Sequence, residues 1–172
     1  MKTRGILIGI AIILSLGGIS TLFAQAQATA TQNLNLIVEE VNKLSITPAS
    51  ISMTITGASW VVGQPTASVT HNTSTYAVTT NSGTNRKITA QLDAGGGSLP
   101  VGAILTVNWI APTGGTSQGA SPLSHLSAID LVKGFHAVSQ SSLGVTYVYT
   151  VTAQTPAGNV SRIVTFTLTA DT

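Results

Sequence analysis

The stretch SRIVTFTLTADT (residues 161–172) decides how the rest of the chain is interpreted. Within it, Val164, Phe166 and Leu168 alternate with threonines. Because successive side chains of a β-strand point to opposite faces, this alternation predicts a strand with one apolar face and one threonine face. Such a strand needs a sheet to receive it.

Similar short runs recur along the chain and are separated by glycine, proline, serine and asparagine. Many short strands with turn signals between them predict an all-β fold, and about eight strands in one domain favour an immunoglobulin-like antiparallel β-sandwich. The expected strands are residues 32–41, 50–55, 74–80, 87–92, 104–110, 129–135, 145–153 and 162–170, with shorter ones at 44–46 and 68–70.

The last two runs predict a hairpin with a defined register. If Tyr149 faces Phe166 across an antiparallel pair, Val151 faces Val164 and threonines align on the other face. A turn is also predicted at residues 81–85, where a glycine is free to take a positive φ (Gly83). We therefore expect one hairpin at the end of the chain and another around Gly83.

The N-terminal residues predict export. A short basic start is followed by an apolar run over residues 6–16 and by Ala-Gln-Ala at residues 24–26, which is the order of a secretory signal peptide. The apolar run is shorter than the roughly 20 residues of a membrane span. We predict a cleaved signal helix over residues 1–26, then a single domain over residues 27–172 with no membrane span. Cleavage after Gly5, as in pilin-type precursors, is the alternative.

Composition excludes several classes of function. The residues after position 26 carry five basic and five acidic side chains, and charged residues make up only 7% of the chain. A nucleic-acid-binding surface needs clustered lysine and arginine, so no nucleic-acid partner is expected. The chain has no cysteine, which excludes disulfides and cysteine-based metal or redox sites.

The sequence predicts no catalytic, cofactor-binding or metal site, and so no enzyme. His71, His125 and His136 stand apart, without the clustered spacing of zinc ligands. Glu39 and Glu40 are neighbours, so on a strand they would point to opposite faces. A hydrolase assembled around the histidines by folding is the third hypothesis for the function.

The two tryptophans have different expected roles. Trp109 shares the parity of Leu105 and Val107, which predicts a core residue. Trp60 lies between strands and is the candidate ligand or partner contact, with burial under a loop as the alternative. An exposed Trp60 would favour a secreted carbohydrate-binding module, so glycans are a candidate partner.

A signal peptide followed by a threonine-rich, one-domain β-protein resembles small secreted immunoglobulin-like proteins of bacterial surfaces, including fimbrial and matrix subunits. The resemblance implies a structural or adhesive subunit, secreted or displayed on the cell envelope, whose partners are further copies or other surface subunits. Leu34, Leu36 and Val38 alternate near the mature N-terminus and are the candidate subunit-pairing strand. Pairing of this strand within its own domain is the alternative.

Overall fold

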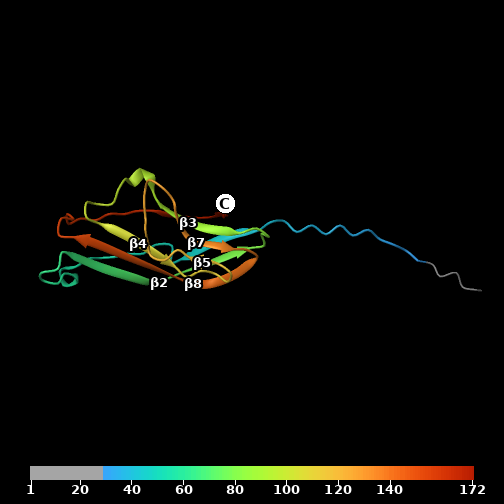
Figure 1. Ribbon diagram of the computed structural model, residues 1–172, viewed down its shortest axis with the longest axis horizontal. Coiled ribbons are helices and arrows are strands. Elements are labelled where there is room, and N and C mark those ends of the chain that lie inside the picture. The colour runs from blue at the N-terminus through green and yellow to red at the C-terminus, as the bar shows by residue number, and fades with distance from the viewer. Residues whose placement is uncertain (1–28) are drawn as a thin grey trace, which may run out of the picture. The chain divides into compact units, whose positions relative to one another are not determined.

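In the computed structural model, residues 29–172 are described, and they are almost entirely β-structure (Figure 1). The predicted signal helix lies outside these residues. Within them, no helix is long and apolar enough to span a membrane. The strands are β1 (Asn42–Thr47), β2 (Thr66–Thr80), β3 (Arg86–Leu92), β4 (Ile104–Trp109), β5 (Thr116–Ser117), β6 (Ser121–Pro122), β7 (Ile129–Phe135), β8 (Val138–Thr152) and β9 (Val164–Ala170), with short 3-10 helices η1 (Gly57–Ser59) and η2 (Ala94–Gly96).

The strands form two antiparallel sheets. One sheet has the order β1-β2-β8-β4-β6, and the other has the order β5-β7-β3-β9. The all-β prediction is therefore confirmed. The compact unit that contains both sheets comprises Val38–Thr172.

Several strands were predicted closely from side-chain alternation. β3, β4 and β7 differ by at most one residue from the expected runs. β2 and β8 are longer than expected, with 15 residues each. A register shift between His71 and Ser74 moves the inward-facing positions of β2 from odd to even numbers, which hides the continuity of this strand in the sequence.

The predicted C-terminal hairpin is wrong. β8 pairs with β2 and β4, whereas β9 pairs with β3 in the other sheet, where Phe166 lies opposite Ala90. Tyr147 and Val151 on β8 are indeed buried, as the alternation predicted. Alternation predicts which side chains face the core, but it fits any partner strand of matching parity.

The predicted turn at residues 81–85 does not close a hairpin either. It connects β2 to β3, which belong to different sheets. Gly83 does not adopt a positive φ, unlike Gly63, Gly97 and Gly102. A connection that crosses between sheets does not need the left-handed turn geometry of a two-stranded hairpin.

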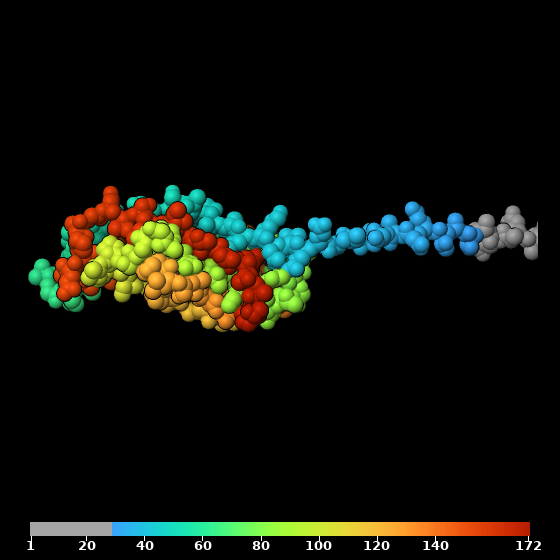
Figure 2. All heavy atoms as spheres, turned by 90° about the horizontal axis from the view of Figure 1, so that it is seen from above, coloured from blue at the N-terminus to red at the C-terminus, as the bar shows by residue number. Residues whose placement is uncertain are grey.

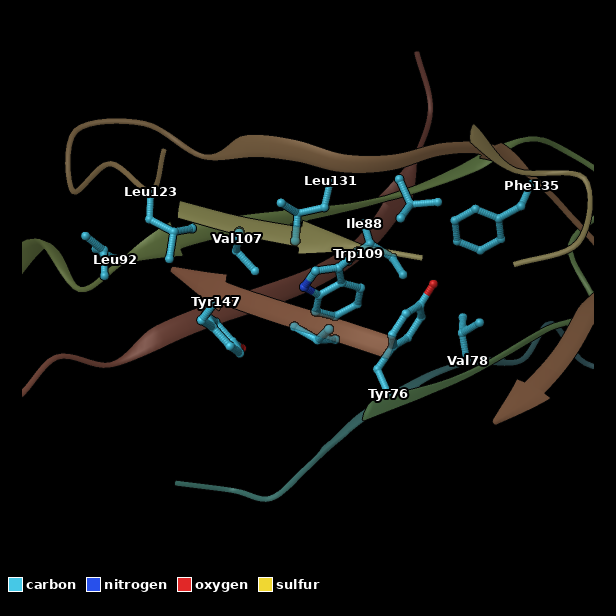
Figure 3. Close-up of a cluster of buried hydrophobic side chains, with 13 residues drawn as sticks. Tyr76, Val78, Ile88, Leu92, Val107, Trp109, Leu123, Leu131, Phe135 and Tyr147 are labelled. Carbon is cyan, nitrogen blue, oxygen red and sulfur yellow. The ribbon is translucent and has the colours of Figure 1, made fainter. Parts of the chain in front are cut away.

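Trp109 is the centre of the core, and its prediction as a core residue is confirmed. It is 1% exposed, and its ring centroid lies 4.1 Å from that of Tyr76 and 4.9 Å from that of Phe166. Tyr76 is on β2, and Figure 3 shows its ring beside the indole among the buried aliphatic side chains. The Tyr76 hydroxyl donates a hydrogen bond of 2.6 Å to the carbonyl oxygen of Ile110. Burial raises the pKa of Tyr76 well above its ordinary value.

We expect Trp109→Ala to lower the free energy of unfolding by about 3–5 kcal/mol, because it removes a buried aromatic side chain that touches both sheets. The matched control is Trp60→Ala, which removes the same side chain from a half-buried position and should cost clearly less. Urea unfolding followed by circular dichroism would measure both. Equal losses in the two variants would contradict the central role of Trp109.

Candidate functional site

The candidate pairing residues near the N-terminus are exposed. Leu34, Leu36 and Val38 are 75%, 78% and 86% exposed, and none of them lies in a strand. The strand expected over residues 32–41 is not formed, and the first sheet begins only at Asn42. An alternating apolar segment gains strand structure only when a neighbouring strand accepts its backbone hydrogen bonds, so its pattern alone is insufficient.

β9 offers a free edge that such a segment could pair with. It hydrogen-bonds to β3 on one side and has no strand on its other side within the described residues. Figure 2 shows the C-terminal part of the chain, coloured red, running along the visible surface of the β body. β5 and β6, which end the sheets on the other side, have only two residues each. β9 and β1 are thus the long edges, and they contact each other.

The core is incompletely covered along this side. The inward-facing residues of β3, next to β9, are fully buried: Ile88 and Ala90 are 0% exposed. The inward-facing residues of β9 and β1 pack against the same core but remain partly exposed. They are Val164, Phe166 and Leu168 on β9, and Leu44 and Ile46 on β1. Apolar side chains that face a core yet stay partly in water lack a covering neighbour.

The stretch after β1, residues 50–55, also packs against the core. Ile51, Met53 and Ile55 are half-buried and alternate with exposed residues, so the predicted inward parity of residues 50–55 is right. The predicted strand is not present, because within residues 29–172 this stretch makes no backbone hydrogen bond that would place it in a ladder. It covers part of the core with side chains only.

The free edge also lacks the usual protection against pairing. Natural edge strands commonly carry lysine, proline or inward-pointing charges, which discourage the addition of another chain. β9 (Val164–Ala170) contains no charged residue and no proline, and the same holds for residues 33–38. Charges begin directly after the strand, where Asp171 pairs with Lys133 at 3.6 Å, and Lys87 and Lys133 on the neighbouring strands both bind Asp130. The hydrogen bond from Lys133 holds the pKa of Asp130 below its ordinary value.

At the β1 end of this side, Glu40 pairs with Arg86. The Asn42 side-chain amide donates a hydrogen bond of 3.0 Å to Glu40 Oε1. This hydrogen bond, together with the charge of Arg86, lowers the pKa of Glu40.

The other candidate residues are half-buried or pack against buried side chains. Trp60 caps η1 and is half-buried, whereas Val61 and Val62 beside it are 65% and 102% exposed. His71 Nε2 lies 2.9 Å from Ser74 Oγ, but Ser74 is 1% exposed and so is closed to a substrate. Within the described part of the chain, no three His, Asp or Glu side chains converge as metal ligands would.

The importance of the β9 edge was missed from the sequence. The signal that was present is the absence of charge from both residues 33–38 and residues 164–170. No protein-family model matches the chain, and no curated protein matches it in sequence. Its function therefore has to be inferred from its own residues and contacts.

We expect alternate backbone amides of β9 to exchange with solvent at very different rates in the unassembled protein. In an antiparallel edge strand, every second residue directs its N–H group away from the sheet. Those amides should exchange at least about a hundredfold faster than their neighbours bonded to β3. Hydrogen exchange followed by NMR, on protein lacking residues 29–37, would measure this. Uniform protection along β9 would contradict a free edge.

Proposed function

We propose that this protein is a secreted, non-enzymatic structural subunit with an immunoglobulin-like two-sheet fold, which assembles by strand addition. In this proposal, residues 33–38 of one copy pair with the free edge of β9 on the next. The observation that carries the proposal is that the inward-facing residues of β9 and β1 are only half-covered, and that the edge strand β9 itself contains no charged residue. The same chain carries an exposed apolar segment with the periodicity of a strand.

The two surfaces match in length and in pattern. β9 has seven residues, and the alternating segment is of similar length. With Leu34, Leu36 and Val38 directed at the half-covered core, Asn33 and Asn35 face outward. They then lie on the same face as the exposed β9 threonines, Thr165 and Thr167. In strand addition, backbone hydrogen bonds supply affinity, and alternate side chains that enter pockets supply specificity.

Strand addition of this kind leads to chains of subunits. The donor segment and the acceptor edge are different surfaces of the molecule, so the contact is head-to-tail, and contacts of this type form open filaments unless the rotation closes a ring. The near-zero net charge of the residues after position 26 opposes close association only weakly. The predicted signal peptide supports assembly outside the cytoplasm, at the cell surface or in a secreted matrix.

The test is the mass in solution over a concentration series, measured by light scattering on protein expressed with its own leader. We expect the unaltered protein to form long assemblies and Leu36→Asp to remain a monomer. Burying an apolar side chain of this size is worth about 1.5–3 kcal/mol. Loss of the Leu36 side chain should therefore weaken the affinity between two copies by roughly 10–100-fold. The buried charge of the new aspartate should weaken it further.

The matched control is Asn35→Asp, which introduces the same charge one residue away on the outward face. This variant should assemble nearly as well as the unaltered protein. Equal effects of the two substitutions would mean that charge, and not the inward parity of the segment, controls association. A compact monomer at all concentrations would refute strand addition and leave glycan binding near Trp60 as the hypothesis to test.

A further inference from the structure

One end of the two-sheet body gathers most of its exposed aliphatic side chains. This end lies where β2 begins and β8 ends, with Thr66 opposite Thr152. Three connections of the chain meet there, formed by residues 56–65, 98–103 and 153–163. The Ala153 N–H donates to the carbonyl oxygen of Pro65 at 3.3 Å. The Thr152 N–H donates to that of Gly102 at 3.1 Å. The three connections therefore lie together, beyond the ends of β2 and β8 (Figure 1).

The tips of these connections are apolar. Six of the eight large hydrophobic side chains that are exposed in residues 42–172 lie on the connections or directly beside them. These six residues form the apolar end, and they are Val61, Val62, Val101, Ile104, Val160 and Ile163. Val62 is 102% exposed and so projects fully into solvent. Single exposed aliphatic residues are ordinary, whereas a group of them on one surface marks an interaction site.

Local structure does not account for the valines at the foremost tip. Residues 61–64 form a β-turn, closed by a hydrogen bond of 3.0 Å from the Gln64 N–H to the carbonyl oxygen of Val61. Gly63 has a φ of +84°, and a turn of this kind requires glycine at its third position. The turn does not require valine at the two positions before it, where polar residues and proline are usual. The apolar character of Val61 and Val62 therefore points to a surface that covers them.

The apolar end carries little charge. Its three connections contain a single charged residue, Arg162, whose Nη2 donates a hydrogen bond of 2.8 Å to the carbonyl oxygen of Ser98. Asp93 borders this end, and its Oδ1 accepts the Ile163 N–H at 3.1 Å. Within residues 29–172, none of the ion pairs involves the three connections. Moving this end out of water therefore desolvates few ionised groups.

The shape of the apolar end fits a lipid surface better than a folded partner. A stable protein interface uses about 20–30 residues on each side and closely complementary surfaces. Six aliphatic side chains on separate tips offer much less contact than that. A lipid layer deforms around protruding tips, so it needs no matching pockets. It receives apolar groups to a depth of about 5–10 Å, at the boundary between headgroups and acyl chains.

The backbone at the tips is suited to that depth. Backbone N–H and C=O groups without a partner are costly away from water. Besides the turn at residues 61–64, each of the other two connections closes a turn with its own hydrogen bond. The Ala103 N–H donates to the carbonyl oxygen of Pro100 at 2.9 Å, and the Thr155 N–H donates to that of Thr152 at 3.0 Å.

We propose that the apolar end inserts shallowly into the surface of an electrically neutral lipid layer. In this arrangement Val61, Val62 and Val101 enter the boundary of the acyl chains. Trp60 is half-buried beside Val61 and lies at the level of the headgroups. Tryptophan is enriched at that level in membrane proteins, because its ring is apolar and its N–H group is polar. The inference does not depend on strand addition, which uses other residues.

Vesicles of phosphatidylcholine test the proposal directly. The full-length sequence, expressed with its own leader, carries Leu36→Asp so that assembly through residues 33–38 does not obscure binding. Flotation in a density gradient measures the protein bound to vesicles. We expect binding to change by less than about twofold when about 30% phosphatidylserine or about 0.5 M salt is added, because the apolar end has no basic cluster to attract anionic lipid.

Val62→Asp should lower the partition into vesicles at least about tenfold, because the tip loses apolar burial and takes a charge into the layer. Val101→Asp makes the same change on a second connection and should have a similar effect. The matched control is Ile110→Asp, which alters a side chain that is 61% exposed beyond the opposite end of β4. This control should bind as the parent does. Circular dichroism verifies that each variant is folded.

Tryptophan fluorescence reports whether this end of the molecule inserts. Phosphatidylcholine with brominated acyl chains quenches tryptophans that reach the chains. Trp109 is 1% exposed, so quenching reports on Trp60. We expect quenching by brominated vesicles and its loss in the Trp60→Phe variant.

Several outcomes would overturn the proposal. These are no flotation with either lipid, binding that requires phosphatidylserine, and a Trp60 that brominated lipid does not quench. Equal losses in Val62→Asp and Ile110→Asp would place the contact elsewhere on the molecule. A lower mass of the Val62→Asp protein than of its parent, measured by light scattering without vesicles, would show that the apolar end binds a second copy instead of lipid.

Discussion

The contact between Trp109 and Phe166 joins the two sheets, and the rest of the structure depends on it. Trp109 belongs to β4, and its ring centroid lies 4.1 Å from that of Tyr76 in the same sheet. Phe166 lies in the other sheet, on the edge strand β9. Without cysteine, the fold has no disulfide to hold its sheets together. Packing of aromatic and aliphatic side chains must therefore hold the two sheets together. The Trp109 indole is the largest fully buried side chain.

The same contact explains why β9 is firmly packed although one of its edges is unpaired. Phe166 anchors the strand to the core from one face, and β3 anchors it along one edge. Its other edge and its half-exposed inward residues remain open, which is unusual for a strand without charges or proline. A strand packed in this way can pair with another chain while it stays bonded to β3. The proposed strand addition requires this combination of a firmly packed strand and an unprotected edge.

The N-terminal side is organised by polar contacts instead. Asn81 and Arg86 bind three consecutive residues before β1, which are Glu39, Glu40 and Val41. Polar side chains suit this role because their hydrogen bonds hold the backbone at little cost in apolar surface.

Side-chain alternation predicted most of the inward-facing residues correctly. Trp109, Tyr147 and Val151 face the core as expected, and even residues 51–55 keep their parity without forming a strand. The errors concern partners. β9 was assigned to β8 instead of β3, residues 81–85 were assigned to a hairpin, and the β9 edge was not recognised as a candidate site. Parity depends on a single strand, whereas pairing depends on which strands meet after the chain has crossed between sheets.

The amino-acid sequence by itself thus determined the all-β class, the alternating faces and the apolar alternation of residues 33–38, because these follow from local periodicity and composition. Only the tertiary structure decided the sheet order, the uncovered side of the core and the contacts of Asn81 with residues 39–41. Those features join residues far apart in the chain, such as Asn81 with Val41 and Ile88 with Leu168, and the hydrogen bonds between them depend on the path of the backbone through both sheets.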